Sequence, residues 1–140
     1  MRRLLFLSAL AAMAIGVVGG AVSNAEELVN PEGSAAFYHL KTLKGQRSES
    51  GRMYLSFLDV EAMSAGLYEI AAGDEDPQSP HGRDEIYVIM SGQARIRVDG
   101  ETRPATKGSV IYVARGVSHR FEDIKEDLTV LVIFAGEVTE

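Results

Sequence analysis

The stretch SPHGRDEIYVIM, residues 79–90, decides the fold and the chemistry expected of this chain. Its second half, from Ile86 to Met90, is rich in β-branched and aromatic residues, which is typical of a β-strand. Side chains an even number of positions apart on a strand lie on one face. His81 and Glu85 are four positions apart. A strand that already runs at His81 would therefore point the imidazole and the carboxylate the same way.

A second histidine, His119, ends the stretch GSVIYVARGVSH, residues 108–119. A neighbouring strand that brought it beside His81 and Glu85 would complete a site for a divalent transition-metal ion. Neutral imidazole and ionised carboxylate together suit Fe, Mn, Ni, Cu or Zn, and three protein ligands leave positions for water, substrate or dioxygen. Any one histidine is more often an ordinary hydrogen-bonded polar residue. The prediction therefore depends on the three residues taken together.

Short strand-like runs recur from residue 53 onward and are separated by glycine-containing turns, one of them at Ser91-Gly92. The expected strands cover residues 53–60, 65–72, 85–90, 94–98, 109–113, 119–124 and 128–135. Asp99-Gly100 is a strong signal for a two-residue hairpin. With no helical periodicity in this region, the pattern predicts an all-β sandwich or barrel. Residues 41–51 are polar and are expected to form a loop.

The first 25 residues predict a signal peptide. A basic start with Arg2 and Arg3 precedes the uncharged run 4–22, and small residues lead up to cleavage after Ala25. An uncleaved anchor is the alternative, because the run is near the lower limit for a membrane span. Cleavage predicts an exported protein, periplasmic or secreted, with no membrane contact afterwards. The expected organisation is a lead-in at residues 26–52 and a barrel domain at residues 53–140.

Composition excludes several classes of function. The chain has 14 basic and 20 acidic residues, so that loss of Arg2 and Arg3 leaves a net charge of −8. This acidic balance argues against nucleic acid as a partner. The absence of cysteine excludes thiolate metal sites and thiol catalysis. There is no nucleophile-elbow, dinucleotide-binding or P-loop motif.

The glycines and ligands together resemble the two motifs of the cupin superfamily. In the first motif, Gly, His, His, Glu and Gly are separated by five, one, three or four, and six intervening residues. In the second motif, Gly, Pro, Gly, His and Asn are separated by five, one, two and three intervening residues. Seven of the ten positions match: Gly73, His81, Glu85, Gly92, Gly108, Gly116 and His119. The likeness spans roughly residues 53–136, and the short distance between the motifs is similar to that of small single-domain bacterial cupins.

The resemblance implies a jelly-roll barrel, also called a double-stranded β-helix, with a metal centre formed by His81, Glu85 and His119. Three positions depart from the motifs: Ser79, Ala114 and Asp123 replace a histidine, a proline and an asparagine. The serine matters most, because a hydroxyl is a poor ligand compared with imidazole. At most three family ligands remain, and loss of the metal, which occurs among cupins, is the alternative. Gln78 has an amide oxygen to offer, but its odd spacing from His81 turns it away on a regular strand, so it is expected only to support the ligands.

Other polar residues have weaker signals. Tyr87 is in phase with Glu85 and should face the cavity, where it would orient a ligand or steady a developing anion, or simply fill the barrel. Arg83 or Arg115 at the barrel mouth would hold a carboxylate, unless both are solvated loop charges. The acidic run at residues 74–76 is expected to be a solvated loop.

Two functional hypotheses follow. The first is a metal-dependent enzyme acting on a small molecule, an oxygenase or isomerase with Tyr87 as the candidate catalytic side chain. The second is a non-catalytic module that binds a sugar, an organic acid or the metal itself. The apolar run 128–134 predicts a strand that is buried on both faces or pairs with another chain, so a homodimer is also expected.

Overall fold

The computed structural model describes residues 35–136, so the predicted signal peptide, and residues 26–34 of the lead-in, lie outside the described residues. The described part forms one helix and six strands: α1 (Leu40–Ser50), β1 (Tyr54–Val60), β2 (Met63–Ile70), β3 (Asp84–Val98), β4 (Glu101–Thr106), β5 (Val110–Val113) and β6 (His119–Ala135). No helix in this range is long and apolar enough to cross a membrane.

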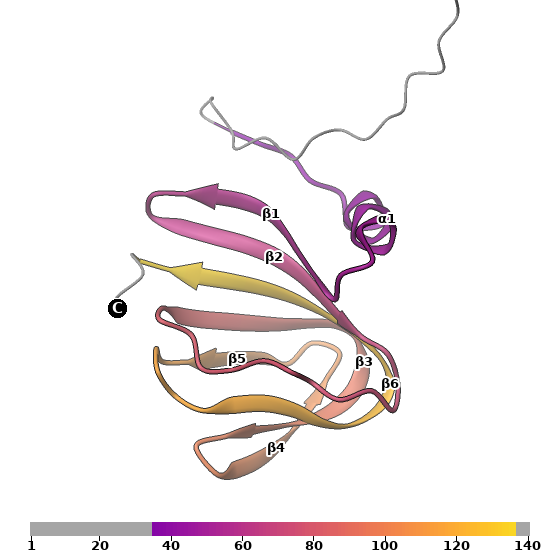
Figure 1. The fold of residues 1–140 in the computed structure, drawn as a ribbon, viewed down its shortest axis with the longest axis vertical. Coiled ribbons are helices and arrows are strands. Elements are labelled where there is room, and N and C mark those ends of the chain that lie inside the picture. The colour runs from indigo at the N-terminus through magenta and orange to yellow at the C-terminus, as the bar shows by residue number, and fades with distance from the viewer. Residues whose placement is uncertain (1–34, 137–140) are drawn as a thin grey trace, which may run out of the picture.

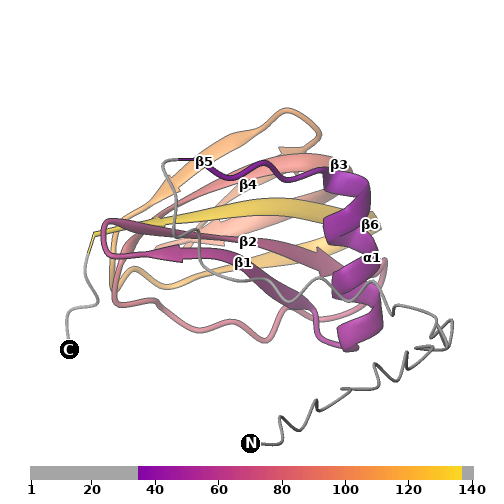
Figure 2. The ribbon, with the colours of Figure 1, turned by 90° about the horizontal axis from the view of Figure 1, so that it is seen from above.

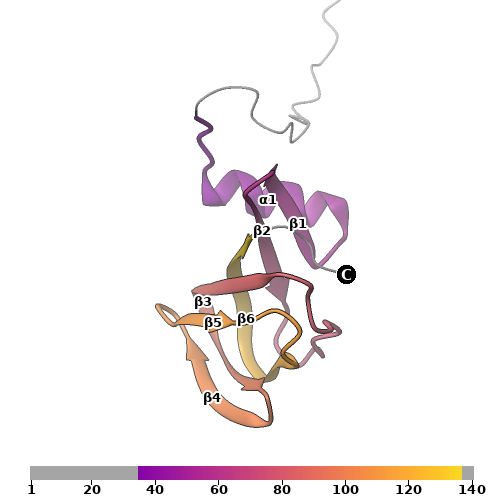
Figure 3. The ribbon, with the colours of Figure 1, turned by 90° about the vertical axis from the view of Figure 1, so that its left-hand side faces the viewer.

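All six strands belong to one antiparallel sheet in the order β1-β2-β6-β3-β4, with β5 paired to β3. The two long strands, β3 and β6, pair along almost their whole length. The first half of β3 also carries β5, and its second half carries β4. Figures 1 and 3 show the sheet curling from β1 and β2 at one end to β4 at the other. The predicted jelly-roll barrel is confirmed.

Both long strands contain positions at which the sequence predicted a break. The expected strands 85–90 and 94–98 are continuous in β3, and 119–124 and 128–135 are continuous in β6. The turn expected at Ser91-Gly92 is instead an irregularity of the β3–β6 pairing, where Gly92 has a φ of 96°. A Cβ at Gly92 would lie 2.4 Å from the carbonyl oxygen of Asp127. Glycine therefore marks a bulge that bends the strand, because only glycine has room there.

The predicted hairpin at Asp99-Gly100 is confirmed. Val98 pairs with Glu101, and the two residues between them have φ values of 48° and 81°. Two positive φ values in a two-residue loop match the twist of antiparallel strands, and aspartate and glycine tolerate this conformation best.

The loop predicted at residues 41–51 is wrong, because α1 occupies this stretch. His39 caps the helix by accepting a hydrogen bond from the Lys41 backbone, and Gly51 ends it in the left-handed conformation. Leu43 is its buried residue. Figure 2 shows α1 lying crosswise to β1 and β2. A helix with so little apolar patterning forms through tertiary contacts, which a sequence window does not reveal.

The apolar run in β6 packs against other residues of the same chain on both faces. Leu128, Val130 and Val132 belong to the barrel interior. Leu131 and Ile133 face the other way and pack against a cluster of Leu43, Phe57, Ala65 and Leu67. One face of the run is therefore buried and the other is partly buried within one chain, and the homodimer stays a prediction.

Candidate metal centre

The structure brings the three predicted ligands together. One ligand atom from each of His81, Glu85 and His119 lies within 4.8 Å of the others. Glu85 is near the start of β3, and His119 is the first residue of β6. The assumption that a strand already runs at His81 is wrong, since β3 begins at Asp84. The loop before β3 nevertheless places His81 Nε2 at 3.8 Å from Glu85 Oε2.

Glu85 carries the main sign that a cation belongs here. Its side chain is 1% exposed, and Oε1 lies 2.8 Å from His119 Nε2. The other oxygen, Oε2, is buried and has no hydrogen-bond partner in the described part of the chain. A buried carboxylate oxygen without a partner is costly, and a divalent cation is a suitable partner. The donor set of two imidazoles and one carboxylate fits a transition-metal ion.

His119 is oriented for binding through Nε2. Its Nδ1 donates a hydrogen bond to the Val117 carbonyl oxygen at 2.7 Å, which fixes the ring and aims Nε2 at Glu85. Burial lowers the pKa of His119, but the hydrogen bonds to Glu85 and Val117 and the charge of Glu85 outweigh it, so that the net shift is upward. A proton on Nε2 thus joins His119 to Glu85, at the place where a cation would join them.

The pKa of His81 is shifted in the opposite direction to that of His119. Burial is the largest effect on its pKa, and together with His119 and Arg83 it outweighs the charge of Glu85 and lowers the pKa. The ring packs edge-on against Phe134, with 5.0 Å between ring centres. His81 is therefore neutral at neutral pH, which is the form in which an imidazole binds a cation.

Gln78 lies at the centre, contrary to its odd spacing from His81. Its Oε1 accepts a hydrogen bond from the Tyr87 hydroxyl at 2.8 Å and lies 3.4 Å from His81 Nε2. The Tyr87 hydroxyl is also 2.9 Å from His119 Nε2, and Tyr87 is 1% exposed, so it faces the interior as predicted. The prediction that Gln78 turns away from the ligands was wrong because residues 71–83 do not form a regular strand. Ser79 is exposed.

Asp76 holds Gln78 in place, so the prediction of a solvated acidic run fails at this residue. Asp76 is 8% exposed. Its carboxylate accepts hydrogen bonds from the Tyr68 hydroxyl at 2.6 Å, the Phe121 backbone N–H at 2.7 Å, and both the backbone and side-chain amides of Gln78. Burial and the bond to Asp76 raise the pKa of Tyr68. No sequence pattern singled out Asp76, because its partners come from distant strands.

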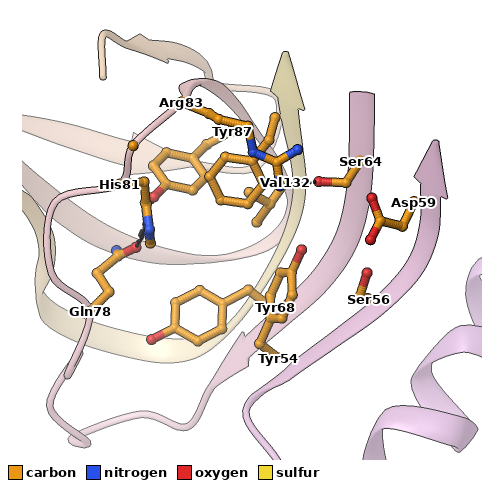
Figure 4. Close-up of a pocket in the computed structure, with 12 residues that line it drawn as sticks. Tyr54, Ser56, Asp59, Ser64, Tyr68, Gln78, His81, Arg83, Tyr87 and Val132 are labelled. Atoms are coloured by element: carbon orange, nitrogen blue, oxygen red, sulfur yellow. Dashed lines mark hydrogen bonds between the residues drawn. The ribbon is translucent and has the colours of Figure 1, made fainter. Parts of the chain in front are cut away.

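A cavity of about 430 Å³ opens beside this centre (Figure 4). His81, Gln78 and Tyr87 line one part, and Arg83, Ser64 and Asp59 line another. Of the two arginines predicted near the site, Arg83 lines the cavity. Arg115 is exposed and does not line the cavity, and its backbone N–H is bonded to Asp84.

Tyr54 forms a wall of the same cavity. A Cβ at Gly66 would lie 2.2 Å from the Tyr54 ring, so the tyrosine rests directly on the backbone of β2. Burial, the largest cause, raises the pKa of its hydroxyl. This close approach requires glycine at position 66.

Comparisons with known proteins agree with this architecture. The family model described as "Cupin domain" matches residues 66–134. An uncharacterised protein of Streptomyces coelicolor is 46% identical over 98 residues, which are 70% of this chain and 93% of that protein.

Two solved structures show the same fold. A DMSP lyase from Ruegeria pomeroyi is 20% identical with a TM-score of 0.58, over 62% of this chain and 48% of the lyase, so the chain matches about half of that enzyme's length. An RmlC-like cupin with a double-stranded β-helix fold from Methanocaldococcus jannaschii is 18% identical with a TM-score of 0.55, over 59% of this chain and 78% of that one. The match to the cupin domain model over residues 66–134, with the motif glycines and the convergent His81, Glu85 and His119, shows that the chain belongs to the cupin superfamily.

Proposed function

We propose that this chain is an exported metal-binding cupin that takes up a small molecule next to a divalent ion held by His81, Glu85 and His119. The observation that carries the proposal is the buried Oε2 of Glu85, which has no hydrogen-bond partner among residues 35–136. Nε2 of both histidines faces the same carboxylate. Ser79 occupies the position of the family's first histidine, so that more coordination positions on the ion would be open to a ligand.

The finer proposal is a metal-dependent oxygenase or isomerase. A bound ion would act there as a Lewis acid or redox centre. The chain's own contribution is orientation. Val117 fixes the His119 ring, and the Asp76–Gln78 pair fixes the Tyr87 hydroxyl, which faces the cavity beside the ligands. Tyr87 is thus placed to orient a bound molecule, and donation of a hydrogen bond to an anion that develops on that molecule would require the hydroxyl to turn away from Gln78.

The alternative is a binding module without catalysis, which the open cavity beside the centre also supports. The two functions differ in a simple assay. An enzyme consumes oxygen or converts a member of a substrate panel, whereas a binding module shows ligand-dependent thermal stabilisation without turnover.

Elemental analysis tests the metal itself. Residues 26–140, purified without chelator, should retain close to one equivalent of a transition metal. Glu85→Ala should lose it, whereas His39→Ala should keep it, because His39 caps α1 and lies outside the ligand set. A wild-type protein that takes up no Fe, Mn, Ni, Cu or Zn on titration would contradict the proposal.

Two further parts of the proposal concern the whole protein. Export rests on the N-terminal pattern at residues 1–25, and processing after Ala25, read by N-terminal sequencing of protein from the producing cell, tests it. A homodimer is supported by exposed apolar side chains on β3 and β5, where Ile86 pairs with Tyr112 and Val110 lies nearby. A monomeric mass by light scattering at micromolar concentration would contradict the dimer.

A further inference from the structure

Arg83 is a cation in the wall of the cavity, and it has no acidic partner among the described residues. Its Nη2 donates a hydrogen bond to the Ser64 hydroxyl at 2.8 Å, and its guanidinium carbon lies 5.2 Å from the centre of the Phe134 ring. Among residues 35–136, no carboxylate lies within 4 Å of the guanidinium nitrogens, although other arginines of the chain form such pairs. An arginine has five N–H donors in a planar fork. One neutral partner leaves most of this fork unused.

The contacts of Arg83 fix the position of its guanidinium group. Ser64 is buried on β2 and fixes one nitrogen, while the Phe134 ring supports the flat face of the group. A guanidinium held in this way loses less conformational entropy when it binds a carboxylate through two parallel hydrogen bonds. In Figure 4 the Arg83 side chain reaches toward Ser64 on one side of the cavity, and His81 and Gln78 lie on another.

The cavity connects this cation with the metal centre. Arg83 and His81 line the same space, and Tyr87 and Val132 also line it. Its volume of about 430 Å³ is in the range typical of small-molecule sites. Asp59, an exposed residue on β1, also lines the cavity and would repel additional negative charge. The charges therefore favour a ligand with two polar ends. Its anionic group would lie at Arg83, and a second oxygen donor would point to His81.

We propose that the cavity binds a small carboxylic acid with a second oxygen donor, such as a dicarboxylate, hydroxy acid or oxo acid. Its carboxylate pairs with Arg83, and its second donor reaches the ion held by His81, Glu85 and His119. The role of the second donor rests on the proposed metal function, whereas the pairing with Arg83 does not. Arg83 would then determine specificity for acids over neutral analogues.

Calorimetric titration with malonate, succinate and glutarate tests this proposal, with malonamide, succinamide and glutaramide as neutral counterparts. Each probe is added to the metal-loaded and to the metal-free protein, and metal content is measured before and after. The variants are Arg83→Met, which keeps an apolar stem, Arg83→Lys, which keeps the charge but not the fork, and Asp59→Asn. Arg115→Met is the matched control, because Arg115 lies outside the cavity.

At least one diacid should bind the metal-loaded wild type more tightly than its diamide. Arg83→Met should weaken that binding by about 10- to 100-fold, the range for a charge-assisted hydrogen-bonded pair, and should leave metal content unchanged. Arg83→Lys should recover part of the loss, Asp59→Asn should tighten binding, and Arg115→Met should have no effect.

The inference is overturned if no diacid binds, if diacid and diamide bind alike, or if Arg83→Met leaves the diacid affinity unchanged. Failure of the metal function is distinguishable from these results. In that case wild type and Arg83→Met both lack metal, yet the metal-free wild type should still bind the diacid more tightly than the variant does.

Discussion

His119 Nε2 lies 2.8 Å from Glu85 Oε1, and the two side chains meet across the barrel interior rather than along a strand ladder. In the pairing of β3 with β6, Glu85 is opposite Phe134, whereas His119 is opposite Val98, at the far end of the ladder. The curl of the sheet is what brings the two ends together. The centre therefore depends on the bends in the long strands as much as on the ligands.

The two histidine ligands should differ in what their loss does to stability. The His81 side chain is 32% exposed, and that of His119 is 1% exposed. His81→Ala should lose the ion with little change in the free energy of unfolding. His119→Ala should lose the ion and about 3–5 kcal/mol of stability, because it leaves Glu85 buried and unpaired. Metal analysis and urea unfolding of the metal-free variants check this, and equal stability losses would be the opposing result.

Metal affinity should fall as the pH is lowered. The pKa of His119 is raised above its ordinary value of 6.5, so a proton competes with the ion from a higher pH than for an ordinary histidine. The pKa of His81 is lowered, so its proton competes only in more acidic solution. Competition titrations with a chromophoric chelator at pH 7.5, 6.5 and 5.5 should show a progressive loss that begins above the ordinary histidine value of 6.5. If the metal affinity does not change over this pH range, the result would argue against histidine ligation.

Gln78, rather than its neighbour Ser79, should support the metal. Gln78 contacts Tyr87 and His81 and is held by Asp76. Gln78→Ala should weaken metal binding by about 10- to 100-fold, the usual effect of losing a hydrogen-bond partner of the ligands. Ser79→Ala should have no effect, because the serine is exposed although it occupies the position of the family's first histidine. The d–d absorption spectrum of the Co²⁺ form provides a second measurement, which should change only in the glutamine variant.

The salt bridges of α1 should make a pH-dependent contribution to stability. Glu69 on β2 pairs with Lys44 and Arg47 of the helix. Burial raises the pKa of Glu69. The hydrogen bonds and charges of Lys44, Thr129 and Arg47 lower it by a larger amount, so that the net shift is downward. A carboxyl group whose pKa is lower in the folded state stabilises the protein at pH values above its ordinary pKa of 4.5. This stability is lost as the pH falls through the pKa of the folded state.

Glu69→Gln should therefore cost about 1 kcal/mol at pH 7 and much less near pH 3, as measured by urea unfolding. Glu101→Gln is the control, because the Glu101–Arg103 pair is solvent-exposed, and it should change little at either pH. A constant deficit of Glu69→Gln across this pH range would mean that packing, not charge, holds the helix.

The bulge in β3 should be intolerant of a side chain. Gly92→Ala places a methyl group against the Asp127 carbonyl at a φ of 96° and should cost about 2–4 kcal/mol of stability. Gly108 has a similar φ of 89°, but a Cβ there meets nothing within 4 Å. Gly108→Ala should therefore cost only about 1 kcal/mol, from backbone strain alone. Similar losses in the two variants would show that steric contact at the bulge is unimportant.

The sequence by itself determined the jelly-roll barrel and the group of His81, Glu85 and His119 as its candidate ligands. Alternating apolar residues and glycine turns define strands locally, and the spacing of Gly92, Gly108 and His119 matched the cupin motifs. The phase of Tyr87 with Glu85 was also predictable, because both lie on one regular strand.

Only the tertiary structure decided the rest. Helix α1, the buried state of Asp76 and the inward position of Gln78 depend on contacts with strands distant in sequence. Residues 71–83 have no repeating backbone conformation, so a side chain's spacing there does not fix its direction. The surroundings of Arg83 were likewise not predictable from its charge. Its contacts with Ser64 on β2 and Phe134 on β6, and the lack of an acidic partner within residues 35–136, follow from how these strands are placed.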